Sequence, residues 1–258
     1  MNQEPPINHE PQGVQIPTRQ VAVQLPSGKP LVTYTLLGLT VIVFALQMAG
    51  ASFYGVDLAA ALGAKVNEAI IVGQVWRLIT PMFLHSTSML LHIVFNMYAL
   101  FSFGPTLERY YGHGRFLTLY LLAGFTGNVL SFVFSPAPSL GASTAIFGLL
   151  GAEAVFLYQN RRLLGRSAQT ALINLVVIAA LNLLLGFSSG FVDNWGHIGG
   201  LVGGVLFAWL GGPLLAVGGE YPNLQVVDKR SRRETVIAAV ALFAAFGFLA
   251  AATIFMRA

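Results

Sequence analysis

The chain contains no cysteine, so disulfides and thiolate metal sites are excluded. Charge is also scarce: 9% of the 258 residues are charged, against about 25% in an ordinary soluble domain. Hydrophobic residues make up 55% of the chain, and the mean hydropathy is +0.71. This composition predicts a polytopic, all-α membrane protein. In such a protein a net charge of +4 reflects topology, so no nucleic-acid partner is expected.

Seven apolar runs predict membrane-spanning helices, each of which needs roughly 17–25 residues. They cover 31–49, 88–106, 115–134, 143–158, 169–187, 195–215 and 235–256. The fourth run is short, and the loop 136–141 before it contains two prolines. Such a loop can dip to membrane depth only where it is buried in protein or lines a wet cavity.

The chain divides into four parts on this basis. Residues 1–29 are polar and rich in proline, and they predict a disordered tail without a cleavable signal peptide. Residues 30–215 contain six of the predicted spans and form the expected core. Residues 216–234 predict a basic cytoplasmic loop, and 235–258 predict an additional C-terminal transmembrane helix.

The distribution of lysine and arginine predicts the orientation. With a cytoplasmic N-terminus, eleven of the 14 basic residues lie inside, and only Lys65, Arg77 and Arg257 lie outside. The inside residues are Arg19, Lys29, Arg109, Arg115, Arg161, Arg162, Arg166, Lys229, Arg230, Arg232 and Arg233. The expected location is the cell membrane, and the starts of runs 143–158 and 195–215 then face the outer leaflet.

The long outer segment 50–87 is unusually apolar for a loop. Long loops without a function are uncommon, so we expect this one to lie partly in the membrane interface. Trp76-Arg77 would anchor it there, because tryptophan is favoured at that depth. An ordinary surface loop is the alternative.

Ser143 begins the fourth run. The Gly141-x-Ser143 pattern alone is weak, and the GxSxG motif of soluble hydrolases is absent because position 145 is alanine. A serine in the first turn of a helix, however, lies beside free backbone N–H groups and the positive end of the helix dipole. That position suits the stabilisation of an oxyanion. The alternative is a structural serine bonded to a helix backbone.

Small residues recur every four positions from Gly196 to Gly204, around His197. Such spacing lets another helix approach closely, and Gly148 offers a matching small surface on run 143–158. Packing of these two runs would bring His197 within hydrogen-bond reach of Ser143. A neutral imidazole can then remove the serine proton. The alternative is a histidine that only packs in the core.

His92 and Asn96 are four residues apart and share one helix face. Both can donate hydrogen bonds, so together they predict part of an oxyanion hole, with interhelical contacts as the alternative. His85 lies near the same rim, with Asn194, and is expected only to bind water. Glu153 lies at the inner end of its run, far from Ser143, and is expected to pair with an arginine there. No carboxylate is then available to orient His197, so the predicted site is a dyad of Ser143 and His197.

A metal site is the main chemical alternative. Its candidate ligands are His85, His92 and His197. The HExxH motif is absent, and the outer half of the predicted spans contains no acidic residue. We therefore expect neither a metal nor a cofactor.

Five motifs, taken in their order along the chain, resemble those of rhomboid intramembrane serine proteases, and the resemblance covers most of residues 31–215. They are Trp76-Arg77, His92-xxx-Asn96, Glu108-Arg109, Gly141-x-Ser143 with Phe147-Gly148, and Gly196-His197-xx-Gly200. The resemblance implies a six-helix rhomboid-like core followed by one extra transmembrane helix.

The same resemblance implies a role for each site residue. Ser143 would be the nucleophile and His197 the base, with His92, Asn96 and the Ser143 amide forming the oxyanion hole. The residues expected to support the site are Gly141, Phe147, Gly196 and Gly200. Phe147 would stack on the catalytic histidine, and run 169–187 would be the gate for substrate.

The implied activity is that of a serine endopeptidase that cuts transmembrane segments of single-pass proteins in the bilayer, without a cofactor. One alternative is a non-catalytic relative that binds transmembrane clients. A transporter is a third reading, but transporters commonly carry inverted repeats, and no convincing internal repeat is visible. The sequence does not indicate an oligomeric state.

Overall fold

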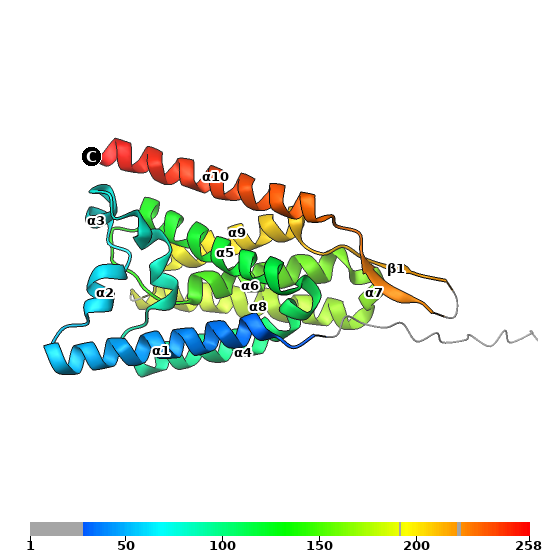
Figure 1. Cartoon of the computed structure of the whole chain (residues 1–258), viewed down its shortest axis with the longest axis horizontal. Helices are drawn as coiled ribbons and strands as arrows, with labels where there is room; N and C mark the ends of the chain where they lie inside the picture. Colours follow the sequence, from blue (N-terminus) through cyan, green and yellow to red (C-terminus); the bar gives the residue numbers. More distant parts are fainter. Residues whose placement is uncertain (1–27, 191, 221–222) are drawn as a thin grey trace, which may run out of the picture.

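The computed structural model describes residues 28–190, 192–220 and 223–258, and nearly all of the predicted tail 1–29 lies outside this part. Each predicted span corresponds to one long helix (Figure 1). These helices are α1 (Leu31–Tyr54), α4 (Leu90–Tyr111), α5 (His113–Phe134), α6 (Ser143–Gln159), α8 (Arg166–Ser189), α9 (Asn194–Gly211) and α10 (Arg232–Arg257). The prediction of an all-α polytopic membrane protein is confirmed.

Five of the long helices, α1, α4, α5, α8 and α10, are long and apolar enough to cross a membrane. Helix α6 is shorter, with 17 residues. Helix α9 begins with polar residues and is rich in glycine. The two helices that fall short of an ordinary span are therefore the two that carry Ser143 and His197.

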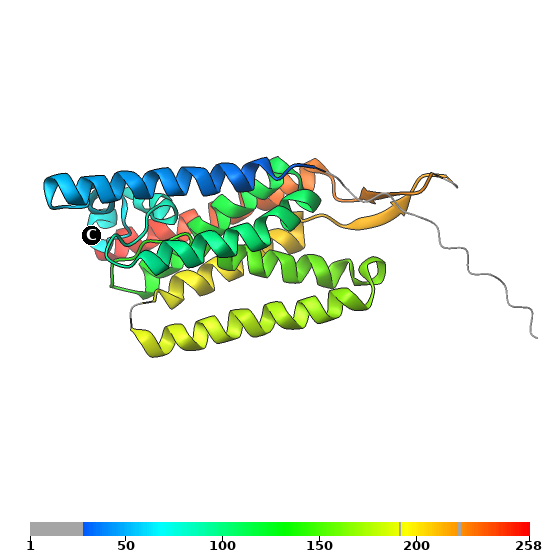
Figure 2. The ribbon, with the colours of Figure 1, turned by 90° about the horizontal axis from the view of Figure 1, so that it is seen from below.

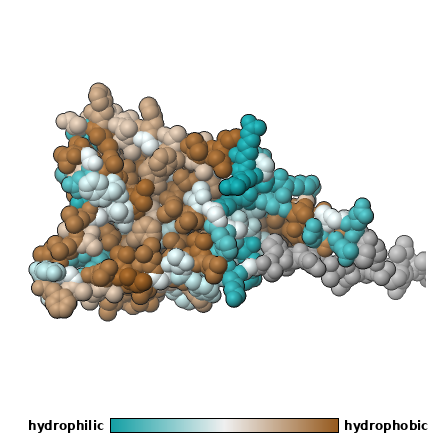
Figure 3. Space-filling view, viewed as in Figure 1, coloured by the Kyte–Doolittle hydropathy of each residue, from teal (hydrophilic) through white to brown (hydrophobic). Residues whose placement is uncertain are grey.

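Helix α5 lies at the centre of the bundle, where 72% of its apolar span is buried, against 11% for α8. Helices α6 and α9 pack beside α5, and α8 lies at the opposite edge of the bundle from α1 (Figure 2). The outer helices expose large apolar side chains such as Phe95 and Leu184. Hydrophobic surface covers most of the visible face, and polar residues gather at the end with the strands (Figure 3). Such a surface suits lipid, because soluble proteins rarely expose large apolar patches.

Helices α6 and α9 approach closely because glycines face the contact. A Cβ added to Gly200 would overlap the backbone oxygen of Thr144, and one added to Gly204 would overlap that of Gly148. Without side chains at these positions, the two backbones pack against each other, as small residues allow in membranes. This contact fixes the distance between the first turns of the two helices.

The segment between α1 and α4 folds into short helices. They are α2 (Leu58–Gly63), α3 (Asn67–Ile71), η1 (Val75–Leu78) and η2 (Thr80–Phe83). Trp76 is half exposed, as an interfacial residue would be, and its Nε1 donates to Leu62 O at 3.0 Å. Arg77 is buried and donates to Ala61 O and Ala64 O, both at 2.7 Å. The predicted anchor is therefore wrong for Arg77, whose guanidinium satisfies carbonyls inside the loop.

The opposite end of the molecule also differs from prediction. Helix α9 ends at Gly211, and the predicted loop contains an antiparallel hairpin of β1 (Leu215–Gly218) and β2 (Gln225–Asp228). The short helix α7 (Arg161–Leu164) lies at this end as well (Figure 1). An ion pair of 2.6 Å between Arg115 and Asp228 connects the hairpin to α5. Helix α10 begins at Arg232, three residues earlier than expected, because Ser231 and Glu234 form a capping box.

Candidate active site

The backbone turns into α6 at Gly141. Its φ of +138° is a conformation that side-chain-bearing residues rarely adopt, and a Cβ there would lie 2.7 Å from His92 Nε2. The Gly141 amide donates to Pro81 O at 2.9 Å, which ties this turn to η2. Helix α6 then begins at Ser143, so this serine lies in the first turn, where backbone N–H groups have no partner within the helix.

Ser143 and His197 meet across the contact between α6 and α9. Ser143 Oγ lies 2.8 Å from His197 Nε2, although the residues are 54 positions apart in sequence. Ser143 is half-buried and His197 is buried. The start of α9 is held by Asp193, whose Oδ1 accepts a hydrogen bond from Gly196 N at 2.9 Å. A serine in contact with a neutral imidazole is the arrangement of an activated nucleophile.

Phe147, one turn after Ser143, stacks on the imidazole of His197. The ring centroids are 4.2 Å apart and the planes are 10° from parallel. This stacking restricts the rotation of the imidazole and keeps Nε2 directed at the serine. Gly196 and Gly200 lie on α9 against Thr144, the residue next to the serine, and leave room for this geometry.

His197 Nδ1 has no hydrogen-bond partner among the described residues. The carboxylate of Asp193 is nearby in sequence, but its oxygens accept from Gly196 N and from Ser131 Oγ. Within the described part of the chain, the serine and histidine therefore form a pair without a third, carboxylate member.

His92 lies on the other side of Gly141. Its Nδ1 is placed to accept a hydrogen bond from Ser86 N at 3.4 Å, so the proton of the neutral ring belongs on Nε2. Nε2 faces Gly141, and a Cβ built on Gly141 would also come within 3.7 Å of Ser143 Oγ. An N–H donor is thereby directed at the region beside the serine.

Asn96 is buried one turn further along α4. Its Nδ2 donates to His92 O at 2.7 Å, so one of its two amide hydrogens is used within its own helix. No hydrogen bond joins Asn96 to Ser143. The structure thus brings Ser143, His197, His92 and Gly141 together and places Asn96 next to this group.

His85 differs from the interpretation that it binds water at the rim. The side chain is fully buried, its Nε2 accepts from Ala142 N at 3.4 Å, and its ring centroid lies 5.1 Å from that of His92. Gln47 pairs with both its backbone N and its backbone O at 3.0 Å. Burial, together with His92, lowers the pKa of His85 to about 3, so the ring stays neutral.

Asn194 also lies inside the protein. It is buried, and its Nδ2 donates to Leu183 O on α8 at 3.1 Å. Its expected role as a water-binding rim residue is therefore wrong: the amide connects α9 to the end of α8.

Glu153 does not pair with an arginine, contrary to prediction. In the described ranges it forms no ion pair, and its Oε2 is buried without a partner. The arginines near the starts of α5 and α7 have other partners: Arg115 pairs with Asp228, and Arg161 lies 4.2 Å above the ring of Tyr158. Among residues 28–190, 192–220 and 223–258, no group of three or more His, Asp or Glu side chains is arranged to hold a metal ion.

A small polar cavity of about 10 Å³ adjoins the serine, roughly the space of one water molecule. Its lining residues are Asn128, Ser139, Leu140, Gly141, Ser143, Thr144 and Asp193. The hydroxyl, amide and carboxylate groups in this list can hold a water molecule beside Ser143 Oγ. Except for Gly141 and Ser143, the sequence did not single out these residues for the site.

Comparison with known proteins identifies the class. A family model described as the Rhomboid domain matches residues 72–214, which is more than half of the chain. The chain belongs to the rhomboid family. Together with the five helices of the described residues that are long and apolar enough to cross a membrane, this family makes it an integral multi-pass membrane protein.

Individual relatives agree with this assignment. The chain is 46% identical over 182 residues to the rhomboid protease GluP of Bacillus subtilis, covering 70% of this chain and 35% of GluP. It is 35% identical over 156 residues to the chloroplastic RHOMBOID-like protein 9 of Arabidopsis thaliana, covering 60% of this chain and 36% of that protein. It is also 36% identical over 146 residues to the putative rhomboid protease YdcA of Bacillus subtilis, covering 56% of this chain and 71% of YdcA. The chain thus spans about a third of the length of the first two relatives.

Proposed function

We propose that this protein is an intramembrane serine endopeptidase that hydrolyses peptide bonds in or beside the transmembrane segments of single-pass membrane proteins. The observation that carries the proposal is the 2.8 Å contact between Ser143 Oγ and His197 Nε2 in a helical membrane bundle. Similarity to a relative named as a rhomboid protease, at 46% identity, supports it.

In the proposed reaction, His197 Nε2 accepts the proton of Ser143 as Oγ attacks the substrate carbonyl carbon. The carbonyl oxygen becomes an oxyanion, which the Ser143 amide, His92 Nε2–H and the second amide hydrogen of Asn96 stabilise. A single such donor typically contributes about 100- to 1000-fold in rate. His197 then gives its proton to the leaving amine, and an acyl-enzyme remains.

Hydrolysis of the acyl-enzyme requires water at a membrane-embedded site. The polar cavity beside Ser143 is suited to hold this water, because Asn128, Thr144 and Asp193 line it. His197 removes a proton from the water as it attacks the acyl carbon, and returns the proton to Ser143 Oγ as the acyl–oxygen bond breaks. No metal or cofactor takes part in these steps.

Substrates would reach the site from the bilayer. Helix α8 is the least buried of the five spans, so its displacement would disrupt few contacts, and we propose it as the gate. A substrate helix must unwind before its peptide bond can be attacked. Glycine or proline near the bond lowers that cost by about 1–3 kcal/mol each.

We also propose that the protein resides in the cell membrane with a cytoplasmic N-terminus and an active site toward the outer leaflet. The end with the hairpin has exposed basic residues such as Arg161 and Arg162. At the end with Ser143, by contrast, Lys65, Arg77 and Arg257 all donate to backbone carbonyls. Lys65 and Arg77 are buried and only Arg257 of these three is exposed, so exposed positive charge is concentrated at the proposed cytoplasmic end.

Labelling with a fluorophosphonate probe tests the nucleophile. The wild-type protein should be labelled at Ser143, and Ser143→Ala and His197→Ala should abolish both labelling and cleavage of a transmembrane substrate in liposomes. Ser102→Ala is the matched control, because Ser102 is exposed on α4, outside the proposed gate, and its hydroxyl bonds only to its own helix. A folded wild-type protein that binds transmembrane clients but is never labelled would favour the non-catalytic alternative.

A further inference from the structure

Lys65, between α2 and α3, is a fully buried lysine. Its ammonium donates to Ala137 O at 2.6 Å, to Ser135 O at 3.0 Å and to Asn67 Oδ1 at 3.2 Å. All three hydrogens therefore have acceptors. Two of these acceptors belong to the loop 135–142 that leads from α5 to Ser143.

The backbone of Lys65 holds the same loop. Lys65 N donates to Ser139 O at 2.9 Å, and Ser139 N donates to Lys65 O at 3.0 Å. Ser139 lies four residues before Ser143 and lines the small polar cavity beside it. Together with the bond from Gly141 N to Pro81 O, these contacts fix the loop from its start to the turn into α6.

We propose that Lys65 is a positioning residue of the active site, whose ammonium holds the loop 135–142 and thereby places Ser143 opposite His197. The inference rests on the proposed protease function. Lys65 does not contact the reacting atoms, so its effect on rate passes entirely through the position of this loop.

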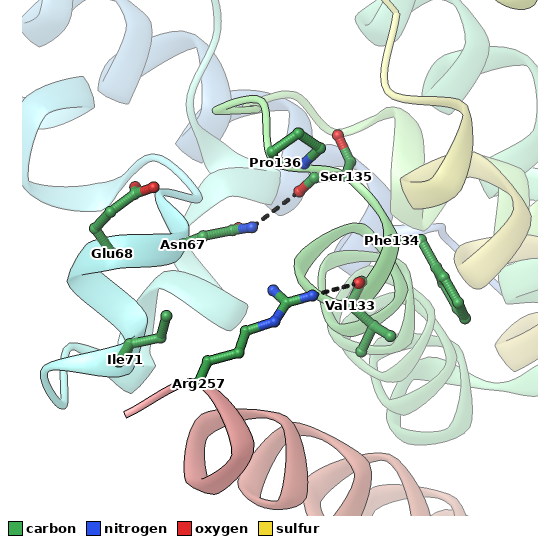
Figure 4. A pocket seen from close by; sticks show the side chains of 8 residues that line it. All are labelled: Asn67, Glu68, Ile71, Val133, Phe134, Ser135, Pro136 and Arg257. Carbon is green, nitrogen blue, oxygen red and sulfur yellow. Dashed lines mark hydrogen bonds between the residues drawn. The ribbon is translucent and has the colours of Figure 1, made fainter.

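Neighbouring side chains hold the preceding turn in a similar way (Figure 4). Asn67 Nδ2 donates to Ser135 O at 3.0 Å, and Arg257 donates to Phe132 O at 2.9 Å and Val133 O at 2.8 Å. These carbonyls lie at the C-terminal end of α5, where no further helical turn can satisfy them. A cavity of about 290 Å³ is lined by residues of α3, of this end of α5 and of α10. Arg257 thus binds carbonyls of the last turn of α5, whereas the carbonyls of the loop 135–142 are bound by Lys65 and Asn67.

Three charged groups face the Lys65 ammonium from the surrounding elements: Asp193 before α9, Glu68 on α3 and Arg257 on α10. None of them forms an ion pair with it in the described part of the chain. Burial therefore dominates and lowers the pKa of Lys65 from 10.5 to about 8. Above that pH the amine is neutral and keeps two N–H donors for its three acceptors, two of which are carbonyls of the loop, so one of the three hydrogen bonds is lost.

Activity and stability should respond oppositely to this titration. Between pH 8 and 10.5 the unfolded chain binds the lysine proton and the folded chain does not, so the contribution of Lys65 to stability rises with pH. The loop, in contrast, is held less firmly over the same range. We therefore expect activity to fall above a pH of about 8 without a matching loss of thermal stability. A lysine with a purely structural role would not separate activity from stability in this way.

The experiment measures the rate of fluorophosphonate labelling at Ser143 from pH 6.5 to 9.5, with thermal unfolding recorded alongside. Lys65→Met should label roughly 10- to 100-fold more slowly at pH 7, since a misplacement of about 1 Å costs about 100-fold. It should also show no decline above pH 8. Lys65→Arg keeps its charge at pH 9.5, so it too should lack the decline. Lys229→Met, at an exposed lysine next to the hairpin, is the matched control.

Hydrogen exchange of the peptide 135–142 provides a readout independent of activity. In Lys65→Met its amides should exchange at least about tenfold faster than in the wild type, while the Lys229→Met control stays unchanged. Wild-type labelling and exchange in Lys65→Met would overturn the inference and leave the protease proposal intact. A wild-type protein that is never labelled would refute the protease, and loop exchange would then decide whether Lys65 holds the loop. If Lys65→Met does not fold, an alkaline decline in Lys65→Arg equal to that of the wild type would overturn the inference.

Discussion

The contact between α6 and α9 makes a quantitative prediction at Gly200. An alanine Cβ there would overlap the backbone oxygen of Thr144, the residue beside the proposed nucleophile. Ordinary van der Waals contact begins at 3.4 Å, so the helices must separate by on the order of 1 Å to admit the methyl group. Because backbone atoms meet here, no side chain can rotate away to relieve the overlap.

The separation acts directly on the 2.8 Å contact between Ser143 Oγ and His197 Nε2. A shift of about 1 Å removes the hydrogen bond and should lower the rate of labelling and of substrate cleavage by about 100-fold. Overpacking of this kind should also lower the free energy of unfolding by about 1–3 kcal/mol. The two effects are measured by fluorophosphonate labelling and by thermal unfolding in the same detergent.

Gly247→Ala is the matched control. Gly247 lies within α10, and a Cβ there would meet nothing within 4 Å, so the same methyl group should leave labelling unchanged. It should raise stability by up to about 1 kcal/mol, since alanine favours helix over glycine. A Gly200→Ala variant that labels as fast as the wild type would show that close contact of α6 and α9 does not set the active geometry.

Two further substitutions test separate parts of the structure. Phe147→Ala removes the ring stacked on His197 and should slow labelling by about 3- to 10-fold, corresponding to about 0.5–1.5 kcal/mol. Phe147→Tyr keeps the ring and should label normally. An equal loss in both variants would contradict the stacking argument. Glu108 accepts hydrogen bonds from Val32 N at 2.8 Å and Thr33 N at 2.7 Å. Glu108→Ala should therefore lower the free energy of unfolding by about 3 kcal/mol and leave the labelling rate of the folded fraction unchanged. An unaltered unfolding temperature would refute this structural role.

Hydrophobic run length and the spacing of small residues were sufficient to predict the bundle and the proposed dyad. The apolar runs gave all seven long helices, because lipid requires a continuous apolar segment for each crossing. The glycines near His197 indicated which helix must lie against Ser143. The structure places that pair in contact, with Phe147 stacked on the imidazole.

The features that the sequence did not reveal depend on contacts between distant segments. From the sequence, Lys65 is only a charge of the outer segment and Arg77 is part of an interfacial anchor, because burial of a cation can be anticipated only when its carbonyl partners are known. His85 was recognised as a histidine near the rim, but nothing in the local sequence indicates that Gln47, 38 residues away, encloses its backbone. The strands of the hairpin are four residues long and carry too few alternations to be distinguished from a loop.

The shortness of α6 has a consequence for how the protein depends on its membrane. Seventeen residues of helix extend about 25 Å, whereas the hydrocarbon layer is about 30 Å thick. With one end anchored at the polar α7 segment, α6 would begin about 5 Å beneath the opposite surface of the bilayer. A thicker bilayer would place Ser143, the proposed nucleophile, deeper and lengthen the path of water to it, and a thinner one would bring it toward the headgroups. If the proposed protease function holds, the rate of substrate cleavage in reconstituted vesicles should therefore depend on the chain length of the lipids.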